Sequence, residues 1–252
     1  NIYQSGVGFG WDEGLYKKWW PADVHVIGKG ILRFHAVYWP AFLLSAKLPL
    51  PKSLFAHGYI TVNGQKMSKT IGNIIDPFEL IGRYGADPLR YYFLRDIPSA
   101  GDGDFSEDKL VERYNGELAN GLGNLVARVA ALGEKISPVR ISQKNDILPE
   151  IEREIMAASK SYDDSFSAIR LNDALSEVWR LIGFADRYIS DTKPWAVNDA
   201  EVLRKIILNA SRLVSAITDI LSPFLPETAG KIQEQIAFKD NVLEIKIIIL
   251  LQ

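Results

Sequence analysis

Two short apolar runs flank an amphipathic stretch near the start of the chain. Residues 22–28 (ADVHVIG) form an apolar run typical of a buried parallel strand, and residues 53–62 (SLFAHGYITV) form the next strand candidate. In residues 31–46 apolar side chains recur at helical spacing, and we expect Pro40 to kink this helix. Strand, helix and strand predict one βαβ unit, which normally lies inside a wider parallel sheet.

Turn and capping signals follow the second strand candidate. The dipeptide Asn63-Gly64 is the strongest two-residue hairpin signal. Two later segments start with aspartate at a helix cap and proline in the first turn, the first with a glutamate at the capping-box position. Residues 99–104 (SAGDGD) form a polar, glycine-rich break and the best candidate domain boundary. The capping residues are Asp76, Pro77 and Glu79 in the first segment, and Asp87 and Pro88 in the second.

The remainder of the chain has a helical pattern. A helix of about eight turns is predicted over residues 105–136, capped by Ser106 and weakened in its middle by three glycines. Apolar stripes then predict helical segments over residues 151–167, 170–192 and 201–236, and we expect the whole bundle to have four or five helices. The end of the chain is continuously apolar and β-prone, and we expect a strand or extended tail packed on another surface.

Composition narrows the class of protein. The chain has 252 residues, 47% hydrophobic and 24% charged, which is an ordinary globular mixture of one or two domains. Its net charge of −2 means that any binding to nucleic acid depends on a local patch. The absence of cysteine excludes disulfides and thiolate zinc sites in this chain and favours a reducing compartment. With no run long enough to cross a membrane, we expect a cytoplasmic protein.

The first residues indicate that more sequence precedes them. The chain opens with NIYQSGVGFG, without an initiator methionine or a signal peptide. We therefore expect it to be a piece of a longer protein.

Two lysines, Lys66 and Lys69, stand three residues apart just past the predicted hairpin turn, in the string TVNGQKMSKT (61–70). Taken alone, such a string is more often a solvated loop than a functional one. The neighbouring segments change this interpretation because four of them, in order and at matching spacing, resemble one family. They are residues 19–51 (WWPADVHVIGKGILRFHAVYWPAFLLSAKLPLP), 56–70 (AHGYITVNGQKMSKT), 76–95 (DPFELIGRYGADPLRYYFLR) and 104–129 (DFSEDKLVERYNGELANGLGNLVARV).

That family is the methionyl-tRNA synthetases of bacterial type, within the class I aminoacyl-tRNA synthetases, and the likeness is to their C-terminal half. The pentapeptide KMSKT matches the KMSKS signature of class I synthetases, with threonine in place of the last serine. The resemblance implies a fold that is α/β plus all-α. It implies a C-terminal part of a Rossmann-type catalytic domain (1–65), a stem-contact segment with the KMSKT loop (66–104), a helical anticodon-binding domain (105–236) and an apolar tail (237–252).

The resemblance also implies a reaction. Methionine–tRNA ligases use ATP, with Mg²⁺, to activate L-methionine as methionyl-adenylate, and then transfer it to tRNA-Met. Lys66 and Lys69 are the implied catalytic residues, because mobile cations stabilise charge on phosphate oxygens in the transition state. The implied ATP-binding residues are Lys66, Ser68, Lys69, Thr70, His57 and Gly58. The implied methionine-binding residues are Tyr3, Ile31, His35 and Trp39, and no metal site is implied in this chain.

Three further residues match family positions that read the anticodon. Asn124 and Arg128 lie four apart on one helix face, and Trp195 matches a tryptophan on which an anticodon base stacks. Unpaired loop bases are recognised in this way, by stacking and by hydrogen bonds along their edges. Without the resemblance, the first two would be interpreted as a solvated helix face and Trp195 as a core-packed aromatic.

Several features leave other functions open. The family's histidine-rich HIGH signature and its inserted metal-binding domain are not in this chain, and HVIG (25–28) matches the signature only in part. Gly30 stands where the family usually has an aspartate facing the active site. One rival is therefore a catalytically inactive tRNA-binding module. For either function, we count the missing N-terminal half among the expected partners of this chain. A second rival is a class I synthetase for another aliphatic amino acid, such as leucine or valine, against which NLVAR and KPW argue.

Overall fold

The structure is a computed structural model that describes residues 13–140, 146–239 and 242–247. Contacts within the chain divide it into two compact units. The first contains the residues up to 66 together with residues 98–104, and the second contains residues 67–97 and 105–252. Tyr3 lies outside the described residues. No helix in the described part of the chain is long and apolar enough to cross a membrane.

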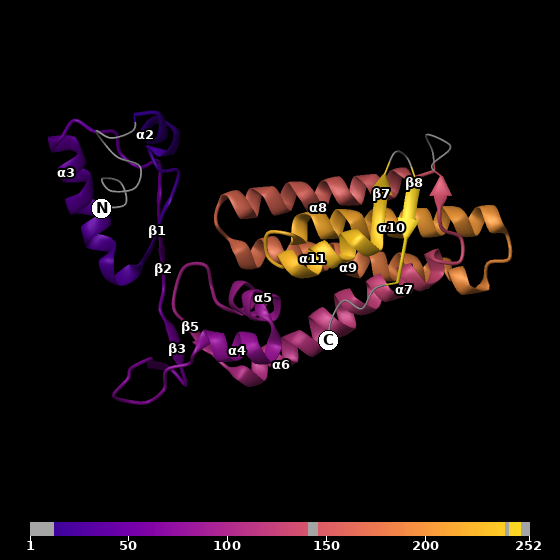
Figure 1. Ribbon diagram of the computed structural model, residues 1–252, viewed down its shortest axis with the longest axis horizontal. Coiled ribbons are helices and arrows are strands. Elements are labelled where there is room, and N and C mark those ends of the chain that lie inside the picture. Colours follow the sequence, from indigo (N-terminus) through magenta and orange to yellow (C-terminus); the bar gives the residue numbers. More distant parts are fainter. Residues whose placement is uncertain (1–12, 141–145, 240–241, 248–252) are drawn as a thin grey trace. The chain divides into compact units, whose positions relative to one another are not determined.

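The predicted βαβ unit is confirmed in the first unit (Figure 1). Strands β1 (His25–Gly28) and β2 (Leu54–His57) are parallel and paired in register, with His25 opposite Leu54 and Gly28 opposite His57. Helical segments connect them: η1 (Lys29–Ile31), η2 (Phe34–Tyr38) and α3 (Trp39–Ser45), while α2 (Glu13–Trp19) precedes β1. The carboxyl ends of both strands therefore share one edge.

A wider helical turn stands where we expected a kink at Pro40. Segment η2 is a π-helix, in which the Trp39 amide donates to the carbonyl oxygen of Phe34, five residues earlier. Pro40 then occupies the first turn of α3. A proline ring clashes with the carbonyl one turn before it and donates no hydrogen bond, and the wider turn accommodates both effects.

The prediction of one strand over residues 53–62 is wrong, because the chain breaks at Gly58 into two strands of different sheets. Strand β3 (Ile60–Val62) pairs with β4 (Gln65–Lys66) and lies between it and β5 (Gly103–Phe105). A Cβ atom at Gly58 would lie only 1.7 Å from the carbonyl oxygen of Gly101. This close approach of a distant backbone segment requires glycine and interrupts the strand.

The predicted hairpin turn is confirmed. Asn63 and Gly64 have φ values of 53° and 71°, and this pair of left-handed residues connects β3 to the antiparallel β4. The carboxylate of Asp104 accepts hydrogen bonds from the Gly64 amide (2.8 Å) and the Thr61 hydroxyl (2.6 Å). Residues 98–104, which contain the glycine-rich segment, accordingly belong to the first unit.

The second unit begins with two short helices, α4 (Pro77–Tyr84) and α5 (Ala86–Asp96). The predicted cap of α4 is confirmed, because Asp76 accepts a hydrogen bond from the Phe78 amide. The predicted cap of α5 is wrong. Gly85, with a φ of +87°, turns the chain, so that α5 begins at Ala86 and the buried Asp87 lies inside its first turn.

A long helical stretch follows in three consecutive parts. They are α6 (Glu107–Arg113), η3 (Tyr114–Gly123) and α7 (Asn124–Gly133). Ser106 accepts a hydrogen bond from the Lys109 amide, which confirms the predicted cap. The glycine-containing middle is helical, with π-type turns in η3.

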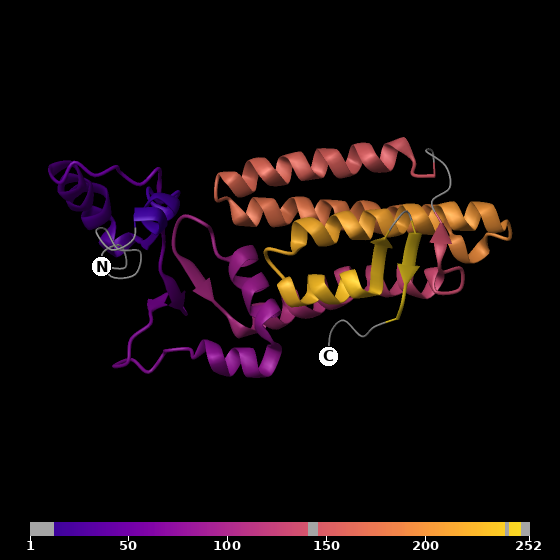
Figure 2. The ribbon, with the colours of Figure 1, turned by 45° about the horizontal axis from the view of Figure 1, so that its top comes forward.

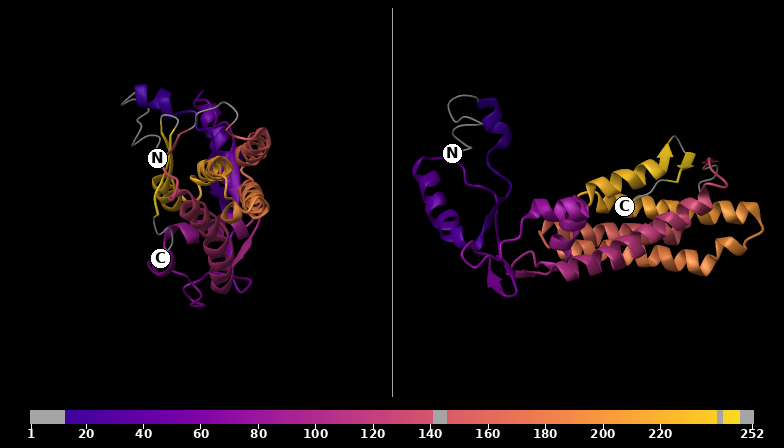
Figure 3. Two further views of the ribbon diagram at one scale, coloured as in Figure 1. Left: turned by 90° about the vertical axis from the view of Figure 1, so that its right-hand side faces the viewer. Right: turned by 60° about the horizontal axis from the view of Figure 1, so that its bottom comes forward.

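The core of the second unit is a helical bundle of α7, α8 (Pro149–Ser167), α9 (Leu171–Thr192) and α10 (Ala200–Leu221), in which α9 and α10 pack with each other and with both α7 and α8. Figure 2 shows α8, α9 and α10 side by side, and the left view of Figure 3 looks along these helices. Fully buried apolar side chains such as Leu125, Leu175 and Leu213 fill the interior. Prolines divide the helical segment predicted over residues 201–236 into α10 and α11 (Pro226–Gln235).

The strand prediction for the apolar end of the chain is confirmed at residues 243–245, whereas the described residues 246 and 247 lie outside the strand. Strand β8 (Val242–Ile245) pairs antiparallel with β7 (Ile236–Lys239) and β6 (Val139–Arg140), in the order β6-β8-β7. Ile245 is buried, and its Cδ1 atom would lie 2.1 Å from a Cβ atom at Gly133 of α7. Because α7 has no side chain there, the apolar end of the chain packs directly on the helix.

Candidate functional site

The shared carboxyl edge of β1 and β2 collects several predicted site residues. Gly28 and His57 are paired at this edge, and each strand runs directly into the next segment, with Lys29 and Gly30 on one side and Gly58 on the other. Ligands of open α/β sheets bind in the crevice outside the carboxyl ends of their strands. This edge is therefore the best candidate site in the first unit.

The His57 imidazole lies across the end of the strand pair. Its Nδ1 atom is 2.8 Å from the carbonyl oxygen of Gly58, and donation from Nδ1 to this oxygen leaves Nε2 as an acceptor. A Cβ atom at Gly28 would lie 3.7 Å from the imidazole Cε1. The exposed imidazole and the backbone of both glycines thus come together, which suits contacts to the edge of a planar ring.

A tyrosine and an aspartate that the sequence analysis missed complete this edge. The Lys66 and Lys29 ammonium groups lie 4.7 and 4.9 Å from the centre of the Tyr59 ring. Lys29 also forms a 2.6 Å ion pair with Asp102, and Asp102 accepts a 2.7 Å hydrogen bond from the Tyr59 amide. The hydrogen bond from Lys29 and then the one from Tyr59 lower the pKa of the Asp102 carboxyl. The acidic, glycine-rich segment 99–104 was the only sequence signal of this contact.

Ser68 organises the segment that carries Lys69. The Ser68 amide donates to the Asn73 side chain (2.8 Å), and the Ser68 hydroxyl accepts from the Thr70 amide (3.2 Å). The Ser68 carbonyl oxygen accepts from the Gly72 amide (3.0 Å). Lys69 and Thr70 are exposed on this turn. The local hydrogen bonds therefore hold the backbone and leave the Lys69 ammonium group to reach an anion.

The residues predicted to contact methionine lie on the helical segments after β1. His35 Nδ1 is 3.0 Å from the Ile31 carbonyl oxygen, and the Ile31 side chain is exposed. His35 meets His25 edge to face, with ring centres 6.3 Å apart, and Trp39 meets Trp20 in the same way at 6.4 Å. These four rings form one aromatic cluster, since Trp20 and His25 are also neighbours at 5.8 Å. Burial, and then repulsion from His35, lower the pKa of His25.

The predicted anticodon residues lie on the helical bundle. Asn124 is exposed at the start of α7, and Arg128 one turn later forms a 3.3 Å ion pair with Asp186 of α9. Burial raises the pKa of Asp186, and Arg128 opposes this shift. Trp195 lies in the 3-10 turn η4 (Pro194–Ala196), between α9 and α10, and is 62% exposed. An indole this exposed is not a core residue, which excludes that alternative for Trp195.

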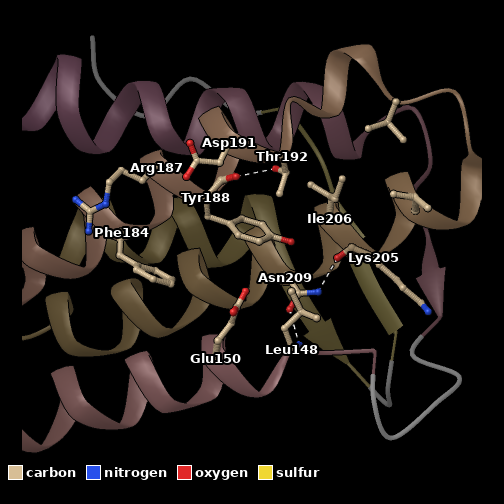
Figure 4. A pocket seen from close by; sticks show the side chains of 12 residues that line it. Leu148, Glu150, Phe184, Arg187, Tyr188, Asp191, Thr192, Lys205, Ile206 and Asn209 are labelled. Carbon is tan, nitrogen blue, oxygen red and sulfur yellow. Dashed lines mark hydrogen bonds between the residues drawn. The ribbon is translucent and has the colours of Figure 1, made fainter.

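A pocket of about 600 Å³ that the sequence analysis missed lies beside η4, among α8, α9 and α10 (Figure 4). Its lining includes Thr192, the last residue of α9, and Val197, the residue after η4. Burial, and then the nearby Glu150 carboxylate, raise the pKa of Tyr188 to about 12. The pocket lining thus combines aromatic rings with charged side chains such as Glu150 and Arg187. Its walls include Leu148, Phe184, Tyr188, Ile206 and Asn209.

No group of three or more histidine, aspartate or glutamate side chains gathers at one point within the described residues. The described part of the chain therefore presents no preformed cluster for a metal ion.

Known proteins resemble this chain over nearly all of its length. Residues 6–130 match the family model described as tRNA synthetases class I (M). A methionine–tRNA ligase of Thermotoga maritima is 40% identical over 95% of this chain and 39% of its own length. One of Bacillus subtilis is 38% identical over 96% of this chain and 38% of its own length.

Solved structures of methionyl-tRNA synthetases also resemble this chain. The Mycobacterium tuberculosis methionyl-tRNA synthetase in complex with methionyl-adenylate matches with a TM-score of 0.84 and 37% sequence identity. The match covers 92% of this chain and 48% of that one, so the chain spans less than half the length of the relatives it matches. The fold is accordingly that of class I tRNA synthetases, with mostly helical content. The chain belongs to the methionyl-tRNA synthetase family.

Proposed function

We propose that this chain is part of a methionine–tRNA ligase and carries its KMSKT loop, part of its ATP and methionine sites, and its anticodon-binding surface. The observation that supports this most is the carboxyl edge of β1 and β2, where His57, Gly58 and Gly28 meet. Lys66 lies in β4, the second strand of the next hairpin, and Lys69 follows it by three residues. Because the chain spans under two fifths of its curated relatives, the activity belongs to a longer protein.

In the proposed first step, a methionine carboxylate oxygen attacks the α-phosphorus of ATP. A new oxygen–phosphorus bond forms, the bond to the β-phosphate oxygen breaks, and pyrophosphate leaves with the electron pair. Lys69 and Lys66 stabilise the negative charge that builds up on the phosphate oxygens. Ser68 and Thr70 contribute hydroxyl groups, His57 and Gly58 contact the adenosine, and Mg²⁺ accompanies the ATP. In the second step, the 3′-terminal ribose of tRNA takes the methionyl group and AMP leaves.

The aromatic cluster after β1 supports methionine as the amino acid. A thioether has no strong hydrogen-bonding group, so selectivity depends on shape, aromatic contact and sulfur polarizability. We propose that Ile31, His35 and Trp39, together with Tyr3, line the methionine side chain. The half-buried His35 and Trp39, each held edge to face by another ring, provide rigid walls of this kind.

The bundle supports the binding of tRNA. We propose that an anticodon base stacks on the exposed Trp195 and that Asn124 and Arg128 bind base edges. The Asp186 carboxylate orients the Arg128 guanidinium before RNA binds. On this proposal residues 1–65 complete a Rossmann-type catalytic domain, residues 66–104 contact the tRNA stem, and residues 105–236 form the anticodon-binding domain.

A chimera tests the proposed reaction. In it, this chain replaces the corresponding residues of the Thermotoga maritima relative. We expect methionine-dependent exchange of pyrophosphate into ATP from the chimera and none from this chain alone, for lack of the histidine signature. Exchange driven by leucine or valine would identify a synthetase for another amino acid. A folded chimera that binds tRNA without any exchange would favour the tRNA-binding module.

A further inference from the structure

The space in front of Gly30 is filled by the side chain of Tyr59. A Cβ atom at Gly30 would lie 2.3 Å from the Tyr59 hydroxyl oxygen and 3.5 Å from the ring carbon Cζ. The first distance is far below any real contact, whereas the second is an ordinary van der Waals distance. A side chain at residue 30 and the hydroxyl of Tyr59 in its present place therefore exclude each other.

Two lysines from different segments lie against the same ring. Lys29 and Lys66, both within 5 Å of the ring centre, are inside the range of a cation–π interaction. Asp102 pairs with Lys29 and also accepts the hydrogen bond from the Tyr59 amide. Asp102 thus holds the Tyr59 backbone, Gly30 leaves room for the Tyr59 hydroxyl, and the electron-rich ring lies against Lys66.

We propose that Tyr59 is a positioning residue that holds Lys66 of the KMSKT loop, and that glycine at residue 30 is what allows Tyr59 to lie there. Lysine side chains in solvent sample many rotamers, so a ring that restricts Lys66 orders it before substrate arrives. The chain thus lacks a carboxylate at residue 30 but has, on the same edge, a Tyr59 ring that restricts Lys66. The further step, that an ordered Lys66 stabilises charge on the phosphate oxygens, rests on the proposed function.

The ring current of Tyr59 gives a direct signal. In this chain with ¹³C-labelled lysine, the Lys66 ε-methylene protons should resonate upfield of those of Lys52, which is exposed and pairs with Asp23. Tyr59→Phe should keep the upfield shift because the ring remains, and Tyr59→Leu should abolish it. An unchanged Lys66 signal in Tyr59→Leu would overturn the proposal.

A pair of substitutions tests the role of Gly30 separately. Gly30→Ala should displace the Tyr59 ring and remove the Lys66 shift. Gly30→Ala in the Tyr59→Phe background should restore it, because only the ordinary contact to Cζ then remains. Gly82→Ala is the matched control, since a Cβ atom there meets nothing within 4 Å. If Gly30→Ala had the same effect in both backgrounds, the coupling between residues 30 and 59 would be refuted.

Inorganic pyrophosphate separates this inference from the proposed function. Added pyrophosphate should perturb the Lys66 and Lys69 signals and leave that of Lys52 unchanged. If pyrophosphate had no effect while Tyr59→Leu still abolished the Lys66 shift, Tyr59 would keep its positioning role and the lysines would lose their proposed phosphate role.

Discussion

The carboxylate of Asp87 in α5 accepts a 2.7 Å hydrogen bond from the backbone amide of Thr228, in the first turn of α11. The two residues are 141 positions apart, and both are buried. A negative charge at this point satisfies an amide that has no partner within its own helix and also complements the helix dipole. Asp87 therefore ties the two ends of the second unit together.

We expect Asp87→Ala to lower the free energy of unfolding of the second unit by about 1–3 kcal/mol, the cost of a lost cap with a buried amide left unsatisfied. Asp87→Asn keeps an acceptor and should cost less. Urea denaturation followed by circular dichroism measures both values. Asp23→Ala, which removes an exposed carboxylate, is the control, and an equal effect of Asp23→Ala and Asp87→Ala would contradict the capping role.

The proposed role of Lys69 predicts a kinetic effect. In an active ligase that contains this chain, Lys69→Ala should slow methionine-dependent pyrophosphate exchange by about two to four powers of ten, the range for lost electrostatic stabilisation. The Michaelis constant for methionine should hardly change, because the amino acid binds elsewhere. Lys52→Ala, which removes another exposed lysine, should leave the rate unchanged. Wild-type exchange in Lys69→Ala would remove Lys69 from the reaction.

His25 predicts a pH dependence of the first unit. Its Nδ1 atom is buried and has no hydrogen-bond partner among the described residues, and its pKa is lowered from the ordinary 6.5. The His25 imidazole thus binds a proton more tightly in the unfolded chain than in the folded unit. Stability should be unaffected by this group above pH 6.5 and should fall as the pH drops from 6.5 through the folded-state pKa.

Proton NMR of the His25 ring measures this pKa directly. The midpoint should lie below 6.5 in the folded chain. His35→Gln removes the second cause of the shift and should raise the midpoint, while burial continues to hold it down. A midpoint at 6.5 in the unaltered chain would mean that the site is open to water.

Asn209, which lines the pocket in Figure 4, predicts a second stability effect. Its fully buried side chain accepts from the Leu148 amide (2.8 Å) and donates to the carbonyl oxygens of Asp146 (3.0 Å) and Lys205 (2.7 Å). Asn209→Leu should lower the free energy of unfolding by about 2–4 kcal/mol, because backbone groups lose partners inside the protein. The Leu148 amide should also exchange its hydrogen faster. Asn198→Leu, at an exposed asparagine, should change neither quantity.

Features that depend on neighbours in sequence could be predicted. The turn at Asn63-Gly64, the caps at Asp76 and Ser106 and the helices of the bundle all follow from residues within one or two turns. The apolar end of the chain was expected to form a strand, and β8 confirms this at residues 243–245. The family resemblance, which rested on ordered motifs, is confirmed by the comparisons.

Features that depend on distant segments could not be predicted. Asp87 follows a capping pattern, but only the fold places Thr228 beside it. The strand predicted over residues 53–62 is divided because the backbone of Gly101 packs against Gly58, and nothing in the neighbouring sequence predicts this contact. Tyr59, likewise, gains its neighbours from segments before and after it.

Trp195 offers the most direct test of the central claim, that this chain is the anticodon-reading part of a methionine–tRNA ligase. The measurement is a titration of this chain with anticodon stem-loops carrying the methionine anticodon or a mismatched one, at two salt concentrations. Trp195→Ala should weaken binding of the matched stem-loop by about 1–3 kcal/mol, the usual contribution of a base stacked on an aromatic ring. Arg128→Ala should weaken it similarly and reduce the preference for the matched anticodon.

The control for this titration is Trp19→Ala, which removes a similarly exposed tryptophan from the first unit and should leave binding unchanged. Added salt should weaken every complex, because phosphate contacts release counterions. The account predicts that the unaltered chain prefers the matched stem-loop and that Trp195→Ala loses this preference. Equal binding of both stem-loops by the unaltered chain, or no effect of Trp195→Ala, would contradict it.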